Sequence, residues 1–517
     1  MALRDRKRWA DAIAQAEELR HSGDRLPAYV RQAEADCLLA LRRPADARRA
    51  YEEVIEAEPQ NESARVGLFF AEVETEDWDA AFANIDSLAA MQKPVTGAGV
   101  AAQPNPAWLN DQITAALARS YGDMQGEAWE RLDYLAAQAP GLAYLRGALG
   151  KVAAARGLPR RAAEEVEIAA SLAPVDLGGQ VALGDSSLWM QEYAEARKRA
   201  EGLALEYPDD PAVQRLIRDV GMVDKWEFES DSHSYNEGVG ILTPNSPGSG
   251  YDSTNRIYSP LLGYQWRVIG GFDYADAHLP EGFAQRYRMG GGIEWRRPFL
   301  TVELTGWDNR GLFHRGGARL DAKWIPTDRW NFAINAALFT WDTPTRALFY
   351  GITANKFGFD VGYDWHESTG FAANFRYLEF SSGNRRLTGG FRFIQKLINR
   401  PHLNITFSPE LYYANNSKPN EPYWNPPAAF AFHPALDIDH TIWRSYEHSI
   451  HQHAHIGAGS FWERGYGTDL NLTDSYELIF NLNAVTNLRA GATYTRRAYD
   501  GEIVNALSFA LSLTRRF

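Results

Sequence analysis

From about residue 222 to the end of the chain, hydrophobic and polar positions alternate in segments of nine to fourteen residues that are separated by turn residues. Strict alternation is the pattern of β-strands with one apolar and one polar face. Before about residue 221, the chain is instead rich in Ala, Leu, Glu and Arg, which are good helix formers. The sequence therefore predicts a helical domain over residues 1–221 and a β domain over residues 222–517.

Prolines that end helices recur along the helical domain at a nearly constant interval. Pro59, Pro94, Pro140, Pro174 and Pro208 are separated by 35, 46, 34 and 34 residues. A period of 34 residues is that of the tetratricopeptide repeat, which is a pair of antiparallel helices. The longer interval indicates an insertion of about twelve residues, which we place in a surface loop over residues 91–106. Small residues occupy one register, where two helices must approach closely: Ala47, Ala81, Ala128, Ala162 and Ala196.

The N-terminal segment fits the second helix of such a repeat. Within residues 6–19, Trp9 and Ala12 align with Tyr193 and Ala196. The first helix of that repeat and the hydrophobic stretch of a signal peptide do not precede this segment. We therefore expect the natural chain to extend further at its N-terminal end. A repeat array of this kind buries a shared core and exposes a concave surface that binds a protein partner or an extended ligand.

The last alternating segment shows the two faces of the β domain most clearly. Large apolar side chains share one face, namely Leu507, Phe509, Leu511, Leu513 and Phe517. Small and polar side chains share the other, namely Ala506, Ser508, Ala510, Ser512 and Thr514. The first face suits lipid and the second suits the lining of an aqueous lumen.

Two further features favour a membrane barrel over a soluble β-sandwich, which would also alternate. Aromatic residues gather near segment ends on the apolar faces, as interfacial girdles do: Tyr287, Trp295, Trp324, Trp330, Trp365 and Trp462. The chain also ends on an aromatic strand residue. About sixteen segments fit into residues 222–517, and a bacterial single-chain barrel has an even number of strands. The predicted fold is thus an α+β multidomain chain, an N-terminal α-solenoid of tetratricopeptide repeats followed by a 16-stranded antiparallel transmembrane β-barrel.

Alternation also predicts which polar side chains line the lumen. We expect a path for a polar polymer lined by carboxylates and an aromatic ring: Asp273, Glu294, Glu303, Asp321, Asp360, Asp364, Glu410, Tyr412 and Asp437. Basic residues share this face, and facing charges are expected to pair in part. His451, His453 and His455 share one strand face about 7 Å apart. Because no carboxylate lies within that run, we interpret them as a solvated stripe and expect no metal site.

Composition excludes several classes of protein. The formal net charge of -13 argues against a nucleic-acid partner, because such proteins carry a basic footprint. A single cysteine, Cys37, excludes a disulfide framework, and its apolar surroundings indicate a buried thiol. The mean hydropathy of -0.40 leaves no run of eighteen apolar residues for a membrane-spanning helix. Catalytic motifs such as G-x-S-x-G, a P-loop and HExxH are lacking, so we expect neither an enzyme nor a cofactor.

Several segments resemble the poly-β-1,6-N-acetylglucosamine export porin family, known as PgaA or HmsH. The similar stretches in the β domain are IYSPLL, GGFDYADA, GGIEWR, GARLDAKW, PYWNP, IWRSYEHS, YGTDL and RRAYDG, and RGLPRRAAEEVE in the helical domain is similar as well. The resemblance implies a Gram-negative outer-membrane barrel with a periplasmic repeat domain. It implies that the chain exports a partly de-N-acetylated polymer for biofilm formation, and that the repeat domain docks the periplasmic deacetylase. Glu294 in GGIEW and Asp321 in GARLD are the acidic residues that it suggests for the path, with outer-membrane lipid around the barrel.

Three alternatives remain beside this interpretation. A cellulose-type exopolysaccharide secretion porin has the same architecture and a neutral cargo, which would need stacking rings more than carboxylates. A scaffold would use the repeats to recruit periplasmic enzymes and the barrel only as an anchor. An outer-membrane hydrolase is disfavoured because the sequence offers no pair of nucleophile and base.

Overall fold

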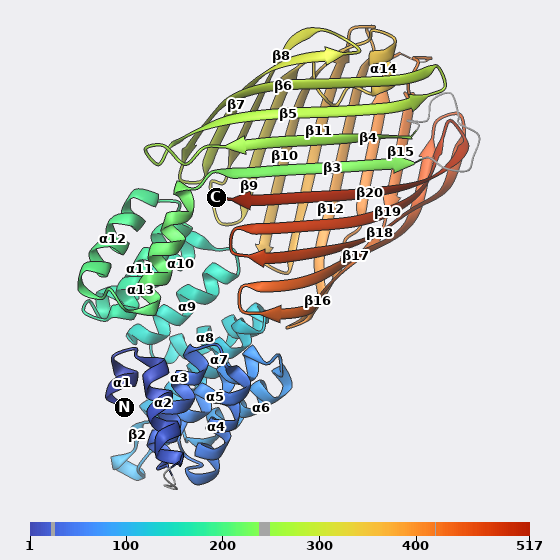
Figure 1. Cartoon of the computed structure of the whole chain (residues 1–517). Helices are drawn as coiled ribbons and strands as arrows, with labels where there is room; N and C mark the ends of the chain where they lie inside the picture. Colours follow the sequence, from blue (N-terminus) through green and yellow to red (C-terminus); the bar gives the residue numbers. More distant parts are fainter. Residues whose placement is uncertain (22–25, 237–248, 419) are drawn as a thin grey trace. The chain divides into compact units, whose positions relative to one another are not determined.

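The computed structural model describes residues 1–21, 26–236, 249–418 and 420–517 (Figure 1). The helical part consists of consecutive helices joined by short connections: α1 (Ala2–Asp5), α2 (Trp9–His21), α3 (Ala28–Ala40), α4 (Pro44–Ala57), α5 (Glu62–Glu74), α6 (Trp78–Met91), α7 (Pro106–Tyr121), α8 (Gln125–Gln138), α9 (Ala143–Ala155), α10 (Pro159–Leu172), α11 (Leu177–Trp189), α12 (Tyr193–Glu206) and α13 (Pro211–Val220). None of the helices among the described residues is long and apolar enough to cross a membrane.

The 34-residue period is visible in where the helices end. Each of α4, α6, α8, α10 and α12 stops two or three residues before a predicted helix-ending proline, because proline lacks the N–H that the next turn would need. The five alanines predicted to share a register, on the same five helices, are completely buried. A larger side chain at this register would force the two helices of a repeat apart. The predicted repeat solenoid is confirmed.

Glycine allows the closest helix approaches in the repeats. A Cβ at Gly150 of α9 would stand 2.7 Å from the side chain of Val166 on α10, and one at Gly67 of α5 would stand 2.3 Å from the ring of Tyr51 on α4. Cys37 lies fully buried in the same core as Tyr51. Burial raises the pKa of the Cys37 thiol to about 11, which keeps it in the unreactive protonated form.

The predicted insertion joins α6 to α7. It is more ordered than a plain loop, because β1 (Val95–Thr96) and β2 (Gln103–Pro104) pair antiparallel across the short 3₁₀ turn η1 (Gly99–Ala101). The following helix α7 begins with Asn105 at its N-cap, where the side chain accepts a hydrogen bond from the backbone N–H of Ala107 at 3.1 Å. A second 3₁₀ turn, η2 (Gly221–Asp224), follows α13.

The remainder of the chain forms one closed antiparallel barrel (Figure 1). Its strands are β3 (Glu227–Asn236), β4 (Ser249–Tyr258), β5 (Trp266–Leu279), β6 (Gly282–Arg297), β7 (Leu300–Gly311), β8 (Arg315–Trp324), β9 (Trp330–Leu338), β10 (Ala354–His366), β11 (Thr369–Phe380), β12 (Arg385–Arg400), β13 (Leu403–Phe407), β14 (Glu410–Asn416), β15 (Ala428–His433), β16 (Ala435–Ser445), β17 (His448–Glu463), β18 (Gly467–Asn483), β19 (Thr486–Tyr499) and β20 (Glu502–Arg516). The last strand pairs with the first, Leu511 opposite Ser232, which closes the sheet.

These eighteen strand segments occupy sixteen strand positions around the barrel, because two of the sixteen strands are each interrupted and so consist of two segments. Strands β13 and β14 both pair with β12, and β15 and β16 both pair with β17. The breaks lie at Pro409 and Pro434, which the flanking registers place opposite each other. Neither proline has an N–H to donate, so both ladders are interrupted at the same level. The register is identical above and below the break, and the prediction of sixteen strands is confirmed.

We call the barrel end at which Glu227 and Arg516 lie the near end, and the opposite end the far end. The outward face carries the predicted apolar rows, and Leu507, Phe509 and Leu511 are about half exposed. Exposed aromatic side chains gather on this face at the near end of several strands, namely Trp266, Trp324, Trp330 and Trp365. Trp462 lies in the outward row at the far end of β17. An outer wall of this composition is suited to contact with lipid, with the aromatic residues at the two interfaces between membrane and water.

Candidate functional site

All nine residues predicted for the polymer path lie on the lumen face of the barrel. Strand pairing places facing residues on the same side of the sheet, and each of these residues stands in a row opposite the exposed apolar rows. Asp273, Glu294, Glu303 and Asp321 follow one another on β5 to β8. The other five lie on strands β10, β14 and β16: Asp360, Asp364, Glu410, Tyr412 and Asp437.

Six of the eight predicted carboxylates form ion pairs with arginine. Arg296 lies 2.7 Å from Glu294, Arg319 lies 2.6 Å from Asp321, and Arg376 lies 2.5 Å from Asp360. On the opposite wall, Arg392 lies 3.2 Å from Glu410 and 2.9 Å from Asp437. The sixth pairing joins Asp273 to Arg256 and Arg288. Among the described residues, Glu303 and Asp364 take part in no ion pair. The sum of charges along the path is therefore much smaller than its number of carboxylates suggests.

One cluster of arginines and tryptophans lines the far half of the lumen beside β5 to β7. The ring of Trp307 lies against Gly271 and Gly290, where a Cβ would stand 2.7 Å and 2.9 Å from it. Glycine at these two positions therefore leaves the space that the Trp307 ring occupies. The guanidinium groups of Arg256 and Arg288 lie 4.4 Å and 4.3 Å from the centre of the Trp307 ring. The ring is buried beneath these two groups and leaves no free face toward the lumen.

The segment between β9 and β10 folds against this cluster. It contains α14 (Thr345–Phe349) and reaches the lumen side of β6, where Arg286 donates to the backbone oxygen of Thr343 at 3.1 Å and packs on the ring of Trp341 at 4.1 Å. At the tip of the β5–β6 hairpin, Glu281 accepts a hydrogen bond from the hydroxyl of Tyr350 at 2.9 Å and pairs with Arg346. We call residues 339–353 the first inner loop.

A second inner loop, residues 420–427 between β14 and β15, lies on the lumen side of the opposite wall. Its Tyr423 is almost fully buried and stacks on Phe380 with ring centres 4.8 Å apart. The indole N–H of Trp424 donates to Glu463 at 3.1 Å. Arg497 of β19 packs on the ring of Trp424 at 4.8 Å and on three further rings, those of Tyr412, Phe461 and Tyr499. The two inner loops thus narrow the far mouth of the barrel.

The three histidines of β17 also face the lumen, and each has a partner on the same wall. His453 lies 2.7 Å from Asp439, and His455 lies 2.7 Å from Asp437. His451 hydrogen bonds to the hydroxyl of Thr441 at 3.0 Å. Both carboxylates come from the neighbouring strand β16, and the sequence of the histidine run itself contains no sign of them. Within the described parts of the chain, no three His, Cys, Asp or Glu side chains are arranged to hold a metal ion.

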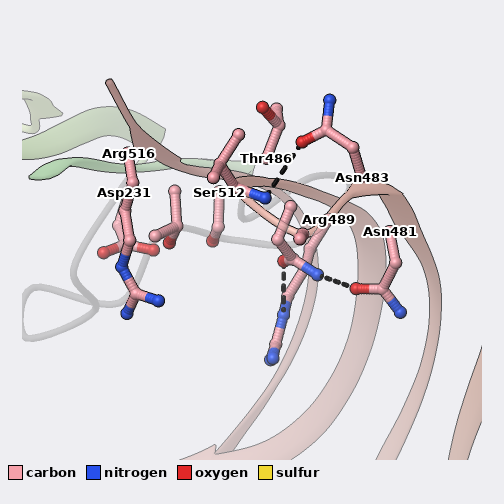
Figure 2. Close-up of a pocket in the computed structure, with 11 residues that line it drawn as sticks. Asp231, Asn481, Asn483, Thr486, Arg489, Ser512 and Arg516 are labelled. Atoms are coloured by element: carbon pink, nitrogen blue, oxygen red, sulfur yellow. Dashed lines mark hydrogen bonds between the residues drawn. The ribbon is translucent and has the colours of Figure 1, made fainter. Parts of the chain in front are cut away.

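Four residues of these clusters were not predicted from the sequence: Trp307, Trp341, Trp424 and Arg497. Trp307 stands in the lumen-facing row of β7, so its position in the alternation could have revealed it. Trp341 and Trp424 lie in connections between strands, where no periodicity predicts the direction of a side chain. On the wall formed by β3 and β18 to β20, the near half of the lumen holds amide and hydroxyl groups around a pocket whose lining includes Asp231, Asn481 and Ser512 (Figure 2).

Comparison with known proteins agrees with this architecture. Residues 235–517 match the family model of the PgaA membrane beta barrel domain. The whole chain aligns at 27% identity with the poly-beta-1,6-N-acetyl-D-glucosamine export protein of Escherichia coli strain K12, and equally with that of strain O157:H7. The chain spans 65% of the length of these curated relatives. A solved structure described as a bacterial polysaccharide outer membrane secretin is 28% identical with a TM-score of 0.53, covering 57% of this chain and 99% of that one. The matched family model covers more than half of the chain, which therefore belongs to the family of the PgaA membrane β-barrel domain.

Proposed function

We propose that this chain is a non-enzymatic outer-membrane porin that exports poly-β-1,6-N-acetylglucosamine, including its partly de-N-acetylated form. The observation that carries the proposal is the closed barrel with an apolar outer wall and a lumen of charged, amide and hydroxyl groups. A polysaccharide needs many weak hydrogen-bonding sites along its path and no deep well. The relatives support the cargo, because the two aligned over the whole chain are named as export proteins for this polymer.

In this proposal, residues 222–517 form the membrane domain and residues 1–221 form a periplasmic domain. The near end of the barrel, where residues 222–227 lead into β3, is then the periplasmic entrance, and outer-membrane lipid surrounds the exposed Leu and Phe rows. The repeat domain docks the periplasmic deacetylase and passes the polymer on. Exposed aromatic side chains on α5 and α7 support an interaction surface on the repeats, since the rings of Phe70 and Tyr121 contact each other 5.7 Å apart in an edge-on arrangement.

Complementation tests the export proposal. The chain is expressed behind a secretion leader in a Gram-negative strain that synthesises the polymer but lacks its own exporter, and surface polymer is measured with a polymer-specific antibody on intact cells. We expect surface polymer to return. Polymer retained in the periplasm, although the barrel is shown by heat-modifiable electrophoretic mobility to be folded, would refute export. Restored secretion of cellulose in the matching cellulose strain would instead support the neutral-glucan alternative.

A second measurement tests the docking of the deacetylase. The chain is purified with the deacetylase and the complex is quantified with and without the substitution Tyr121→Ser. We expect the substitution to weaken the complex, because Tyr121 is the more exposed member of the aromatic pair. An unchanged dissociation constant of the complex would show that Tyr121 is not part of a docking surface, and failure to form any complex would refute docking of the deacetylase.

A further inference from the structure

A polar pocket of about 370 Å³ opens in the near half of the lumen wall, between β3 and the near ends of β18, β19 and β20 (Figure 2). Its lining contains three asparagine carboxamides, hydroxyl groups, one carboxylate and two guanidinium groups, and it contains no aromatic ring. The export proposal does not assign a role to this pocket. A surface of amides and hydroxyls is suited to hydrogen bonding with the hydroxyl and acetamido groups of a sugar.

The pocket has a defined order across three strands. Ser512 of β20 pairs in register with Asp231 of β3 on one side and with Arg489 of β19 on the other. Neighbouring strands are about 4.8 Å apart, so the backbones that carry the carboxylate and the guanidinium group are about 10 Å apart with a hydroxyl between them. This separation leaves room for one sugar ring over Ser512.

Hydrogen bonds hold the asparagines in fixed orientations. The Nδ2 of Asn487 donates to Oδ1 of Asn481 at 2.5 Å, and the Nδ2 of Asn481 donates to the hydroxyl of Ser449 at 2.8 Å. Arg489 donates from Nε to Oδ1 of Asn487 at 3.4 Å, as the dashed lines in Figure 2 show. Its two terminal nitrogens are not used by these bonds. Side chains that are oriented in advance lose less conformational entropy on binding.

Asp231 is the acceptor on the other side of the pocket. Its side chain is exposed to the lumen, and it forms no ion pair within the described parts of the chain. Arg516, which also lines the pocket, pairs with Glu227 at 2.5 Å and so does not neutralise it. A carboxylate offers two acceptor oxygens and no donor, whereas a guanidinium group only donates. The pocket therefore presents the two acceptor oxygens of Asp231 on one side and the two terminal donor nitrogens of Arg489 on the other, with room for one sugar ring between them.

These properties distinguish between glycosidic linkages. In a β-1,6-linked hexosamine chain, C1 and O6 carry the linkage, so the hydroxyls at C3 and C4 are both free and adjacent. In a β-1,4-linked chain, O4 of every unit except the non-reducing terminal one is part of the linkage, so this pair does not exist along the chain. The two oxygens of Asp231 can accept one hydrogen bond from each hydroxyl of a vicinal pair, while Arg489 can donate to the acetamido oxygen of the same unit.

We propose that the pocket around Ser512 is a sugar subsite that selects β-1,6-linked N-acetylhexosamine chains, with Asp231 accepting from the free 3- and 4-hydroxyls and Arg489 donating to the acetamido oxygen. The proposal rests on the proposed export function and names a specificity determinant within it. A subsite at the near end would hold the polymer weakly as it enters and would reject chains that lack the vicinal hydroxyl pair. Its hydrogen bonds are few and solvated, as passage requires.

Binding of two tetrasaccharides to the full chain in detergent tests the subsite. One is β-1,6-linked N-acetylglucosamine. The other is its β-1,4-linked isomer with a 4-O-methyl group on the non-reducing unit, so that none of its units has a free pair of 3- and 4-hydroxyls. Binding of each is measured by isothermal titration or saturation-transfer NMR. We expect the 1,6-linked chain to bind at least about tenfold more tightly, and Asp231→Asn to abolish that difference. The matched control is Asp469→Asn, which removes a lumen carboxylate near the far end of β18 and should keep the preference. Equal dissociation constants for the two isomers, or a preference that survives Asp231→Asn, would overturn the subsite.

A second variant tests the opposite side independently. Arg489→Gln should weaken the 1,6-linked N-acetylglucosamine chain several-fold and leave the 1,6-linked glucose chain unchanged, because glucose lacks the acetamido group. Equal weakening of both chains would contradict the role of Arg489. Neither test decides whether the chain exports the polymer. If the chain restores surface polymer but binds both linkages equally well, the subsite is refuted and the export function is still supported.

Discussion

Arg288 donates from Nε to Oδ2 of Asp273 at 2.6 Å, and both side chains are almost completely shielded inside the barrel, at 5% and 0% exposure. A second arginine, Arg256, donates to the same carboxylate at 3.0 Å. Two guanidinium groups therefore depend on one buried carboxylate for their neutralisation. Removing a single partner of a buried ion pair is strongly destabilising, because the charge that remains stays desolvated.

We predict that Asp273→Asn destabilises the barrel by about 3–5 kcal/mol, the range typical of a broken buried pair. The measurement is the urea dependence of unfolding, followed by heat-modifiable electrophoretic mobility. Asp364→Asn serves as the control, because this lumen carboxylate has no ion pair among the described residues and should change stability little. Equal stability of the two variants would mean that the arginines find other partners.

The first inner loop offers a prediction about conductance. Glu281→Ala removes the acceptor of both Tyr350 and Arg346, which tie α14 to the β5–β6 hairpin. We expect the loop to leave the far mouth more often and the mean single-channel conductance in planar bilayers to rise at least twofold. Glu367→Ala, in the turn between β10 and β11, is the control that should leave conductance unchanged. An unaltered conductance of the Glu281 variant would show that the loop does not obstruct ions.

Two carboxylates on one strand should affect ion selectivity in different ways. Neutralising the unpaired Asp364 removes one negative charge from the lumen and should lower cation selectivity modestly. Neutralising Asp360 also releases Arg376, with which it pairs at 2.5 Å, so the shift toward anions should be larger. The reversal potential across a salt gradient measures the ion selectivity of each variant. If the first inner loop closes the far mouth to ions, both substitutions are made in the Glu281→Ala variant. A reversed order would contradict the pairing of Asp360.

Phe509 tests the assignment of the outer wall. It is 54% exposed at the middle of β20, in the row with Leu507 and Leu511. We expect Phe509→Arg to cost about 2–4 kcal/mol of membrane assembly, as charged residues on the lipid face near the bilayer midplane do. The measurement is the yield of folded barrel in lipid vesicles. Phe509→Leu is the conservative control, and normal assembly of the arginine variant would show that the row does not face lipid.

Glu72 makes the stability of the repeats depend on pH. Burial in α5 raises the pKa of this carboxyl to about 7. Because the folded pKa is raised, the folded state binds more protons than the unfolded state, and stability falls as the pH rises from about 4.5 to about 7. Glu72→Gln removes this loss, so it should stabilise α5 and α6 by about 3 kcal/mol at pH 8 and by little at pH 4.

Amide hydrogen exchange of α5 and α6 in the full chain measures this effect, with wild type and variant compared at the same pH. The exposed Glu62, at the first position of α5, provides the control variant Glu62→Gln, which should leave exchange unchanged. Faster exchange in the Glu72 variant at pH 8 would indicate that the carboxylate is stabilised by a partner such as Asn84, whose side chain lies 3.4 Å away.

Most of the architecture follows from periodicity, for physical reasons. The interval between helix-ending prolines marks each repeat because proline stops a helix wherever it occurs. The strand faces follow from alternation because successive side chains on a strand point to opposite sides. The two interrupted strands preserve this alternation as well. Leu411 after Pro409 points outward, as Phe407 before it does. The number sixteen was therefore predictable, although the interruption was not.

The chemistry of the lumen was less predictable, because it depends on contacts between strands that are distant in sequence. Alternation placed Asp437 inside the barrel but could not show that Arg392 pairs with it from β12. It could not predict that Trp424, in a connection, would contact Arg497 of β19 either. Such contacts are decided by register and by how loops fold back, and neither is encoded in a local pattern of polarity.

The facing prolines Pro409 and Pro434 have a mechanical consequence. Along a continuous ladder, bending one half of a strand strains the hydrogen bonds of the other half. Where two adjacent strands lack backbone N–H donors at the same level, the two halves of each strand are less strongly coupled, and the barrel wall is more flexible there. The wall should therefore bend more easily at this level than at levels where the hydrogen-bond ladders are continuous, and the half of the barrel that carries the inner loops lies beyond this level.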